Sequence, residues 1–251
     1  MKARVSIVIP TLDEAEALPA TLSQLDALSP PPCEVIVADG GSTDETESVA
    51  RTAGATFVRC RRRGRAAQMN EGARRAAGDI LAFVHADTWL WPNAAEVMAR
   101  TLDDRRNACG GFVSLMAGPR GVRWLTSLHN FVKTWYAPLL FRPHLFFFRH
   151  ARLLFGDQVI FCRREDFLEV GGYREEPVME EATLCMALCR RGRVVQVPHV
   201  VVSSDRRVRA WGFWRSHARF MLIGTLWGLG VSGRRLRALY PDVRDQRTSA
   251  S

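Results

Sequence analysis

The sequence predicts a single α/β domain in which a mostly parallel, Rossmann-like sheet is flanked by helices. Short apolar runs alternate with stretches of helical spacing through the first hundred residues. The chain has 251 residues, enough for one large hydrophobic core. Hydrophobic residues make up 47% and charged residues 24%, which is typical of a folded globular protein. This composition excludes a disordered chain, a collagen and a coiled coil.

Four strands and four helices are expected before residue 105. The strands are continuous apolar runs, as in buried parallel strands, at 5–10, 34–38, 56–60 and 80–84. The helices have apolar residues at helical spacing, at 14–28, 43–53, 64–77 and 92–102. Ser42 and Glu45 form an S-x-x-E pattern that predicts a capping box at the second helix. Alternating strands and helices predict a parallel sheet with helices on both faces.

The second half is less regular. Strands are expected at 110–116, 159–162 and 194–197. Helices are expected at 122–140, as one helix or a pair, and at 165–170 and 180–191, and two more are expected within 209–239 around the glycines of 230–233. No linker or internal repeat separates the halves, so we expect the second half to extend the sheet of the first.

Acidic and hydroxyl side chains follow three of the expected strands. Thr11 and Glu14 follow the first strand, Asp39 the second, and His85 and Asp87 the fourth. In open α/β sheets, ligands bind beyond the carboxyl ends of the strands, so these residues are predicted to converge there. The sequence has no dinucleotide-binding glycine loop, no P-loop and no G-x-S-x-G elbow. Carboxylates at this edge favour a divalent cation beside a phosphate, or hydrogen bonds to a base and ribose.

The net charge of +9 is unevenly distributed. Residues 1–100 carry −2, residues 101–200 carry +4, and residues 201–251 carry +7. Such a basic segment suits a membrane surface, a phosphorylated acceptor or nucleic acid, and a solvated arginine face is the alternative. The apolar stretch at 220–233 is too short to span a bilayer. Its arginine flanks suit an interfacial position, and packing against the domain is the alternative.

Six cysteines occur without a C-x-x-C pair, so no zinc site is expected. The sequence shows no secretory signal. We therefore expect reduced thiols and a cytoplasmic location.

The order of the motifs resembles the family 2 glycosyltransferases, which have the GT-A fold and use nucleotide-diphospho-sugars. The motifs are P-T-x-x-E at 10–14, D-G-G-S-T-D at 39–44, N-x-G at 70–72 and the acidic motif after the fourth strand. Others resemble a narrower subgroup associated with radical-SAM and selenium-type domains and linked by name to arsenosugar biosynthesis. These are R-A-A-Q-M-N-E-G-A at 65–73, H-A-D-T at 85–88, G-D-Q at 156–158, G-G-Y at 171–173 and P-V-M-E-E at 177–181.

The resemblance implies transfer of a sugar to a hydroxyl acceptor with inversion (EC 2.4 class), assisted by Mn²⁺ or Mg²⁺. It places the following residues in the substrate site: Thr11, Glu14, Asp39, Arg65, Gln68, Asn70 and Gln158. It places Asp87 at the metal, together with His85, which replaces the first acid of the usual D-x-D motif. Glu181 stands where the family has its catalytic base, normally an aspartate, and Asp157 is the next candidate for a catalytic role.

Some of these residues also have an ordinary structural explanation. Asp39 and Asp44 are typical of helix starts, and we favour capping for Asp44 and ligand binding for Asp39. Glu180 and Glu181 could be a charge pair that stabilises a helix N-terminus. The helix repeat points Glu180 about 100° away from Glu181. Together with the resemblance, this favours Glu181 as the base.

The implied organisation is one GT-A domain over residues 1–251. Residues 1–104 form the nucleotide-sugar-binding half, 105–205 the acceptor and catalytic half, and 206–251 the basic C-terminal helices. These helices are expected to contact the inner face of a membrane peripherally, and nucleic acid is not an expected partner. Two alternatives stay open. One is a nucleotidyltransferase, which would need a glycine-rich basic loop after the first strand. The other is a catalytically weak binding protein that docks on membrane or RNA.

Overall fold

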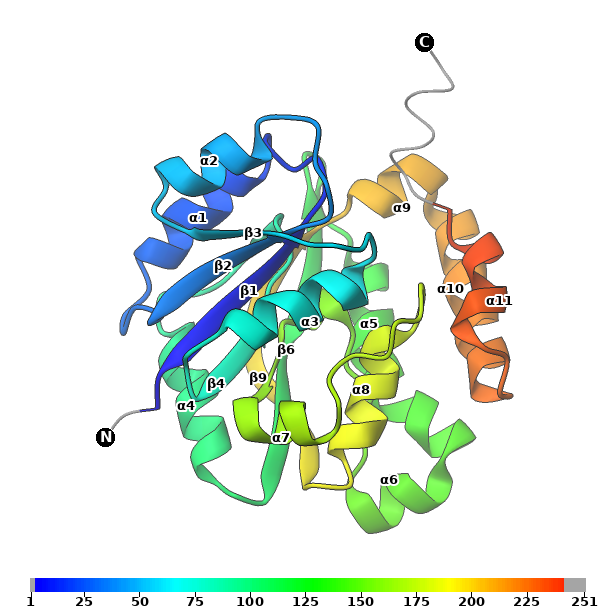
Figure 1. Ribbon diagram of the computed structural model, residues 1–251. Coiled ribbons are helices and arrows are strands. Elements are labelled where there is room, and N and C mark those ends of the chain that lie inside the picture. Colours follow the sequence, from blue (N-terminus) through cyan, green and yellow to red (C-terminus); the bar gives the residue numbers. More distant parts are fainter. Residues whose placement is uncertain (1–2, 242–251) are drawn as a thin grey trace.

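A nine-stranded sheet runs through the computed structural model, which describes residues 3–241 (Figure 1). Its order is β3-β2-β1-β4-β8-β6-β9-β5, and β7 pairs with β6 at the side. The strands are β1 (Val5–Thr11), β2 (Glu34–Asp39), β3 (Thr56–Arg59), β4 (Ile80–Phe83), β5 (Thr88–Trp89), β6 (Asn107–Gly118), β7 (Gly121–Val122), β8 (Ile160–Arg163) and β9 (Arg193–Ser204).

The helices lie on both faces of this sheet. They are α1 (Leu18–Asp26), α2 (Thr46–Thr52), α3 (Arg65–Arg75), α4 (Ala94–Asp103), α5 (Trp124–Phe141), α6 (Pro143–Arg149), α7 (Arg164–Glu169), α8 (Glu180–Leu188), α9 (Arg206–Trp211), α10 (Phe213–Gly228) and α11 (Gly233–Leu236), with 3₁₀ turns η1 (Gly156–Gln158) and η2 (Arg237–Leu239). Both halves share one sheet, which confirms the predicted single α/β domain.

The first four long strands are parallel, and the second half joins them through β8. β1 pairs in parallel with β2 and β4, and β2 with β3. β8 runs antiparallel to both β4 and β6, and β9 is parallel to β6. The carboxyl ends of β1, β2 and β4 therefore lie at one edge, as the alternating pattern predicts.

Two hydrophobic cores cover the two faces of the sheet. Neighbouring residues of β1 belong to different cores, because successive side chains of a strand point to opposite faces of the sheet. Val8 lies in one core, and Ile7 and Ile9 lie in the other. The core with Val8 includes Met69 of α3, while the other includes Leu18 of α1. Figure 1 shows α3, α7 and α8 on one face, with α1 and α4 on the other.

The structure corrects the expected elements at several places. The short strands β5 and β7 were not expected, and β6 runs from Asn107 to Gly118 instead of from 110 to 116. β9 continues to Ser204, beyond the predicted end at 197. Its pairing with β6 shifts register around Pro198 but resumes at Val200, so the strand does not end there. α6 was not expected. The predicted capping box is wrong, because α2 begins at Thr46 and the Ser42 hydroxyl donates to Asp39 instead.

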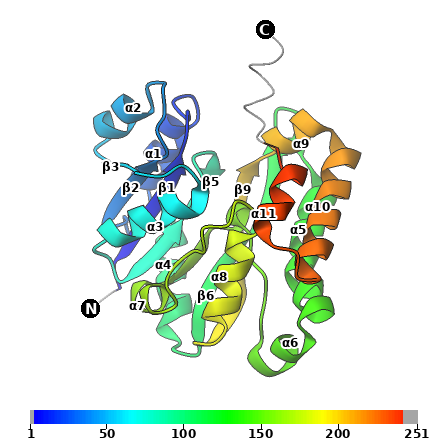
Figure 2. The ribbon, with the colours of Figure 1, turned by 45° about the vertical axis from the view of Figure 1, so that its right-hand side comes forward.

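The C-terminal segment packs as three helices rather than the expected two. α10 and α11 flank the glycines of 230–233 as predicted, and α9 precedes them. α10 lies beside α5 (Figure 2), and Ile223, Leu236 and Val178 form a small core beneath it. The part of the predicted segment at 242–251 lies outside the described residues. Among residues 3–241 no helix has the length and apolar character needed to cross a membrane.

Substitution by alanine is predicted to have opposite effects on stability at two helical glycines, Gly72 of α3, which packs against β1, and Gly224 of α10. A Cβ at Gly72 would lie 2.4 Å from Cγ1 of Val8, whereas one at Gly224 of α10 would meet no heavy atom within 4 Å. Gly72→Ala should lower the free energy of unfolding by about 1–3 kcal/mol through overpacking. Gly224→Ala should raise it by up to about 1 kcal/mol, because alanine is the better helix former. Urea unfolding measures both, and a Gly72→Ala variant as stable as the wild type would contradict the packing described.

Candidate active site

The ends of β1 and β2 meet at the predicted edge of the sheet. Thr11 and Asp39 are partners in the parallel ladder, and the Thr11 hydroxyl donates to the Asp39 carboxylate over 3.3 Å. Asp39 is fully buried, and its other oxygen accepts from the backbone N–H groups of Gly41 and Ser42 at 2.8 and 2.9 Å. Asp39 thus shapes the turn after β2, and its contact with a base ring stays a prediction.

Asp44 acts locally, although the N-cap residue of α2 is Glu45 and not Asp44 as predicted. Its carboxylate accepts from the backbone N–H of Thr46, the first residue of α2, at 3.0 Å, and from that of Ala15 at 3.0 Å. These bonds tie the start of α2 to the loop after β1, which carries Glu14.

Two predicted substrate residues on α3 point into the protein. The Gln68 amide donates to the backbone carbonyls of Thr11, at 2.5 Å, and Ala38, at 3.0 Å. The Asn70 amide donates to the carbonyl of Tyr173 at 2.8 Å and accepts from its N–H at 2.9 Å. Gln68 therefore holds the ends of β1 and β2, and Asn70 holds the turn before α8. Their contact with a nucleotide is an untested prediction.

Glu14 and Asp87 converge on one cationic side chain, Arg206. The Arg206 guanidinium donates to both carboxylate oxygens of Glu14 at 2.8 Å, and its Nε lies 3.1 Å from Oδ2 of Asp87. Glu14 and Asp87 are largely buried, whereas Arg206 is partly exposed. Burial raises the pKa of Asp87, and the charge of Arg206 acts against that shift. The arginine compensates two desolvated carboxylates at once.

Sequence reasoning did not place Arg206 in the site. It follows β9, and the predicted strand there ended at 197, seven residues before Ser204. Had the apolar residues at 200–202 been interpreted as a continuation of that strand, Arg206 would have been a residue after a strand end, like Glu14 and Asp87.

A second charged cluster lies around the start of α8. Arg65 Nη1 is 2.9 Å from Oε1 of Glu181, and Arg65 Nε is 3.6 Å from Oε1 of Glu180. Both glutamates are buried in the first turn of the helix, where the helix dipole favours carboxylates. Burial, with the neighbouring charge of Glu181, raises the pKa of Glu180 to about 7. Glu181 is therefore held by an arginine, and Glu180 is poised to carry a proton near neutral pH.

His85 lies beside Glu181, next to Gly156. A Cβ at Gly156 would be 2.6 Å from Nε2 of His85 and 2.7 Å from Oε1 of Glu181, so both groups border the space left by this glycine. His85 Nε2 is buried and has no hydrogen-bond partner among residues 3–241. Burial, together with the charges of Arg65 and Arg206, lowers the pKa of His85 well below its ordinary range. The imidazole is thus neutral and can accept a hydrogen bond or ligate a metal.

Asp157 is held by α5. Its Oδ2 accepts from the Asn130 amide at 2.7 Å, and Nζ of Lys133 lies 3.3 Å from Oδ1 of Asn130. Burial raises the pKa of Asp157 and lowers that of Lys133, while the charge of each opposes the shift of the other. Gln158 is fully buried and bonds to Thr134 of α5. Its contact with a substrate was predicted and is untested.

Backbone strain flanks this cluster. Val159, directly after η1, has φ = 52°, and Met179, directly before α8, has φ = 68°. A branched or long side chain in this region is costly, and such residues are often found at functional sites. These two turns set the positions of Asp157 and Glu181.

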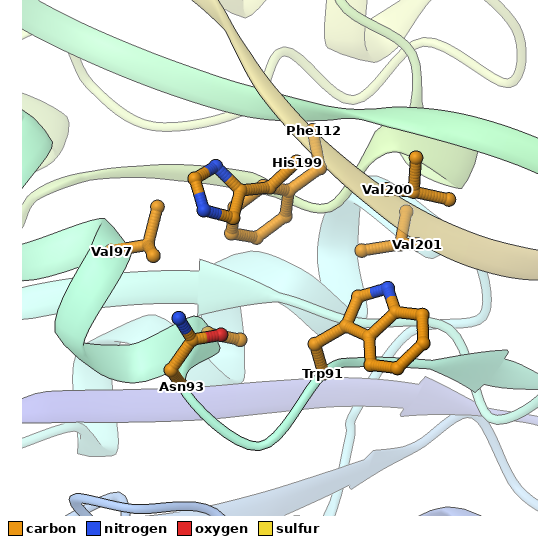
Figure 3. Close-up of a pocket in the computed structure, with 8 residues that line it drawn as sticks. Trp91, Asn93, Val97, Phe112, His199, Val200 and Val201 are labelled. Carbon is orange, nitrogen blue, oxygen red and sulfur yellow. The ribbon is translucent and has the colours of Figure 1, made fainter.

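A small hollow between α4 and β9 is not this site (Figure 3). It is lined mainly by apolar residues, among them Trp91, Val97, Phe112 and Val201, with Asn93 and His199 at its side. Its volume is about 10 Å³, room for one water molecule rather than a nucleotide-sugar. None of the predicted site residues lines it.

The donor set suits a divalent cation that shares its coordination with a phosphate. Within the described part of the chain, no three His, Cys, Asp or Glu side chains cluster as a complete metal cage. Two carboxylates, Glu14 and Asp87, do converge on one positive charge, that of Arg206. A Mg²⁺-type site commonly uses one or two carboxylates and completes its shell with substrate phosphates and water. The residues present fit such a site.

The model of the family described as "Glycosyl transferase family 2" matches residues 6–168. This range covers β1 to α7 and more than half of the chain. An uncharacterized glycosyltransferase of Mycobacterium bovis is 29% identical over 131 residues, 52% of this chain and 58% of that protein. A PGL/p-HBAD biosynthesis glycosyltransferase of Mycobacterium bovis is 37% identical over 101 residues, 38% of this chain and 39% of that protein. The chain thus matches less than two thirds of the length of these relatives.

Two solved structures share the fold. A mannosyltransferase from Pyrobaculum calidifontis, in complex with GDP-Man and Mn²⁺, has a TM-score of 0.65 at 23% identity, over 89% of this chain and 63% of that one. Glucosyl-3-phosphoglycerate synthase from Mycobacterium tuberculosis, with Mn²⁺, UDP and its product, has a TM-score of 0.63 at 21% identity, over 91% and 81%. Both similarities show the GT-A fold.

The buried glutamates predict how stability depends on pH. A carboxyl with a pKa of about 7 in the folded protein and an ordinary value of 4.5 in the unfolded chain takes up a proton on folding. Its contribution is fully present below the unfolded pKa and is lost as the pH rises through about 7. Glu180→Gln removes this titration. Relative to the wild type, the variant should gain stability between about pH 5 and about pH 8.

Urea unfolding across this range measures the difference. Glu16→Gln, at an exposed carboxylate of the loop after β1, is the matched control and should give a curve parallel to the wild type. A Glu180→Gln curve that also stays parallel would contradict the described environment of Glu180.

Proposed function

Since this chain belongs to glycosyl transferase family 2, we propose that it transfers a sugar from a nucleotide-diphospho-sugar to a hydroxyl acceptor, with inversion and with a divalent cation. One observation carries the proposal beyond the family. The carboxylates of Glu14 and Asp87 converge on Arg206 at the strand ends, and the Arg65–Glu181 pair lies beside His85, whose pKa is lowered by burial and by the charges of both Arg65 and Arg206. A donor diphosphate at the first cluster would bring its sugar towards the second.

At the donor cluster, Asp87 would hold Mn²⁺ or Mg²⁺, with Glu14 beside it and His85 as a further candidate ligand. The bound ion would supply the positive charge that stabilises the leaving diphosphate. Arg206 now neutralises the two carboxylates, so it must yield part of this contact when another cation arrives. Its guanidinium then becomes available to the phosphate oxygens, which it can bind bidentately.

At the acceptor cluster, Glu181 would take the proton of the acceptor hydroxyl. The Arg65 guanidinium donates to the Glu181 carboxylate at 2.9 Å and holds it in place. Glu180, buried beside it, would share the proton that Glu181 receives. Asp157, fixed by Asn130, would bind sugar or acceptor hydroxyls.

These positions suit a single in-line displacement. With the diphosphate at the Glu14–Asp87 cluster and the acceptor hydroxyl at Glu181, the acceptor oxygen would attack the face of the sugar that points away from the leaving group. One displacement of this kind inverts the anomeric carbon. A retaining reaction through a covalent intermediate would need a carboxylate nucleophile instead.

The division of the chain follows from these roles. Residues 1–104 supply Glu14 and Asp87 for the donor, and residues 105–205 supply Asp157 and Glu181. The segment 206–251 contributes Arg206 to the donor site as well as the basic helices. Membership of the radical-SAM-associated subgroup is a further part of the proposal, supported by the motifs at 156–158 and 177–181.

We also propose a cytoplasmic location with peripheral contact at the inner face of a membrane. All six cysteines are free thiols, and four of them are buried. Unpaired thiols suit a reducing compartment. The membrane contact involves a surface separate from the strand ends that bind the donor.

The proposal is tested by donor hydrolysis and by two matched substitutions. In the presence of Mn²⁺ or Mg²⁺, one nucleotide-sugar of a panel that includes GDP-mannose and UDP-glucose should be hydrolysed slowly without an acceptor. Glu181→Gln should keep donor affinity and lower turnover about 10²-fold or more, the usual effect of removing a general base. Glu180→Gln should lower it less, since Glu180 acts through Glu181.

The outcome distinguishes the alternatives. A larger loss in Glu180→Gln would exchange the roles of the two glutamates. Hydrolysis of none of the donors, with no metal-dependent binding of a nucleoside diphosphate, would contradict the proposed function.

A further inference from the structure

The exposed apolar side chains of this protein are concentrated on three helices. Of the 17 large hydrophobic residues exposed among the described residues, 14 lie on α5 and α6 and on α10 with the residue after it. They are Trp124, Leu125, Leu128, Phe131, Val132, Trp135, Leu139, Leu140, Phe147, Phe148, Trp214, Met221, Leu222 and Leu229. We call this surface the α5–α6–α10 face. Contiguous apolar surface of this kind marks an interaction site.

α5 is amphipathic, but its polar side faces the protein and its apolar side faces outwards. Its polar residues Ser127, Asn130 and Thr134 are buried, and they bond to Met116, Asp157 and Gln158. Its aromatic and aliphatic residues are exposed, with Trp124 at 69% and Leu128 at 58%. A helix that turns its apolar stripe outwards is stable only where the outer phase is itself apolar or is covered.

The three helices form a continuous surface. α5 contacts both α6 and α10. The Tyr136 hydroxyl lies 3.3 Å from Sδ of Met221, and the rings of His129 and His217 are 5.6 Å apart. Figure 2 shows α5 and α10 side by side, with α6 at their lower end. The apolar stripes of α5 and α10 therefore adjoin.

The charge of this face has one sign. Residues 119–156 and 206–240, which contain all three helices, hold 14 arginines and lysines and no aspartate or glutamate. Three of these cations, Arg123, Lys133 and Arg206, lie instead near carboxylates from other parts of the chain, which leaves 11. Some of these cations lie directly on the apolar side chains: the Arg152 guanidinium is 4.1 Å from the centre of the Trp135 ring and 4.4 Å from that of Phe146. Exposed Arg149 and Arg215 lie on α6 and α10.

We propose that the α5–α6–α10 face docks on an anionic lipid bilayer, with the exposed Trp, Phe and Leu side chains in the interface and the arginines at the headgroups. Tryptophan and arginine side chains are characteristic of this zone. An apolar surface surrounded by cations without acids matches anionic lipid in both respects. A nucleic acid would match the charge but not the exposed leucines. A second copy of this face would bring its arginines against one another.

This face differs from the contact predicted from the sequence. The apolar stretch at 220–233 contributes only part of it, since Ile223 and Gly228 are buried. The larger share comes from α5 and α6, where the sequence does not distinguish the inner from the outer side. The inference rests on the proposed function only for the location of the enzyme.

Co-sedimentation with vesicles tests the proposal. The wild-type protein, without nucleotide or metal, should bind phosphatidylglycerol-containing vesicles at low salt and pure phosphatidylcholine vesicles much more weakly. Phe147→Ser with Phe148→Ser should lower the partition coefficient at least about tenfold. Arg149→Glu with Arg215→Glu should lower it at least about 25-fold, since each of the two cations near an anionic surface is worth about fivefold.

Two double variants elsewhere on the surface are the matched controls. Trp89→Ser with Leu168→Ser removes apolar side chains that are 50% and 44% exposed on β5 and α7. Arg75→Glu with Arg100→Glu reverses two exposed charges on α3 and α4. Both should bind vesicles within about twofold of the wild type. Unchanged thermal unfolding midpoints establish that all four variants are folded.

Three results would overturn the proposal. One is a wild-type protein that stays in the supernatant with both kinds of vesicle at low salt. Another is equal loss of binding in the control and face variants. The third is a stable dimer or an RNA complex, abolished by Phe147→Ser with Phe148→Ser, in a protein that does not bind vesicles. Donor hydrolysis is measured without lipid, so a failure of the proposed function appears there and not in vesicle binding.

Discussion

Burial of carboxylates, at the strand ends and at the starts of η1 and α8, is the constraint on which this site depends. Glu14, Asp87, Asp157, Glu180 and Glu181 are all removed from most of the solvent, and an uncompensated buried charge is costly. Three cations from distant parts of the chain compensate them: Arg206 after β9, Arg65 at the start of α3, and Lys133 on α5. These pairs bring together the N-terminal half, α5, α8 and the segment after β9, which are far apart in the sequence.

The same arrangement separates the two tasks of a sugar transfer. In the donor cluster, the Arg206 guanidinium lies between the carboxylates of Glu14 and Asp87. A divalent cation with a bound diphosphate can take its place there. The acceptor cluster holds Glu181 through Arg65, and burial raises the pKa of the neighbouring Glu180 to about 7. α5 connects this chemistry to the surface, since its polar side holds Asp157 and its apolar side faces outwards. An acceptor bound near Asp157 would lie beneath the helix that we propose to dock on lipid.

Local pattern was sufficient to predict the frame of the fold and much less of the site. The apolar runs of β1, β2 and β4 predicted strands whose ends lie together, and hence the convergence of Glu14 and Asp87. The partner of that pair, Arg206, was not predicted, because Pro198 interrupts the pattern of β9 six residues before the strand ends. Gln68 and Asn70 were correctly assigned to a helix, but their inward direction depends on backbone groups of Thr11 and Tyr173 that no local pattern reveals. The outer side of α5 was also beyond local reasoning, because its polar residues are the buried ones.

The central claim is that the Arg206 guanidinium occupies, beside Asp87, the position that a divalent cation takes when the donor binds. Binding of Mn²⁺ tests this claim most directly. Free Mn²⁺ can be followed by electron paramagnetic resonance in wild-type protein, Asp87→Ala and Arg206→Ala, with and without a nucleoside diphosphate. The account predicts that Asp87→Ala stays folded but loses Mn²⁺-dependent nucleotide binding, and that Arg206→Ala binds Mn²⁺ alone more tightly than the wild type. Unchanged Mn²⁺ and nucleotide binding in Asp87→Ala would contradict it.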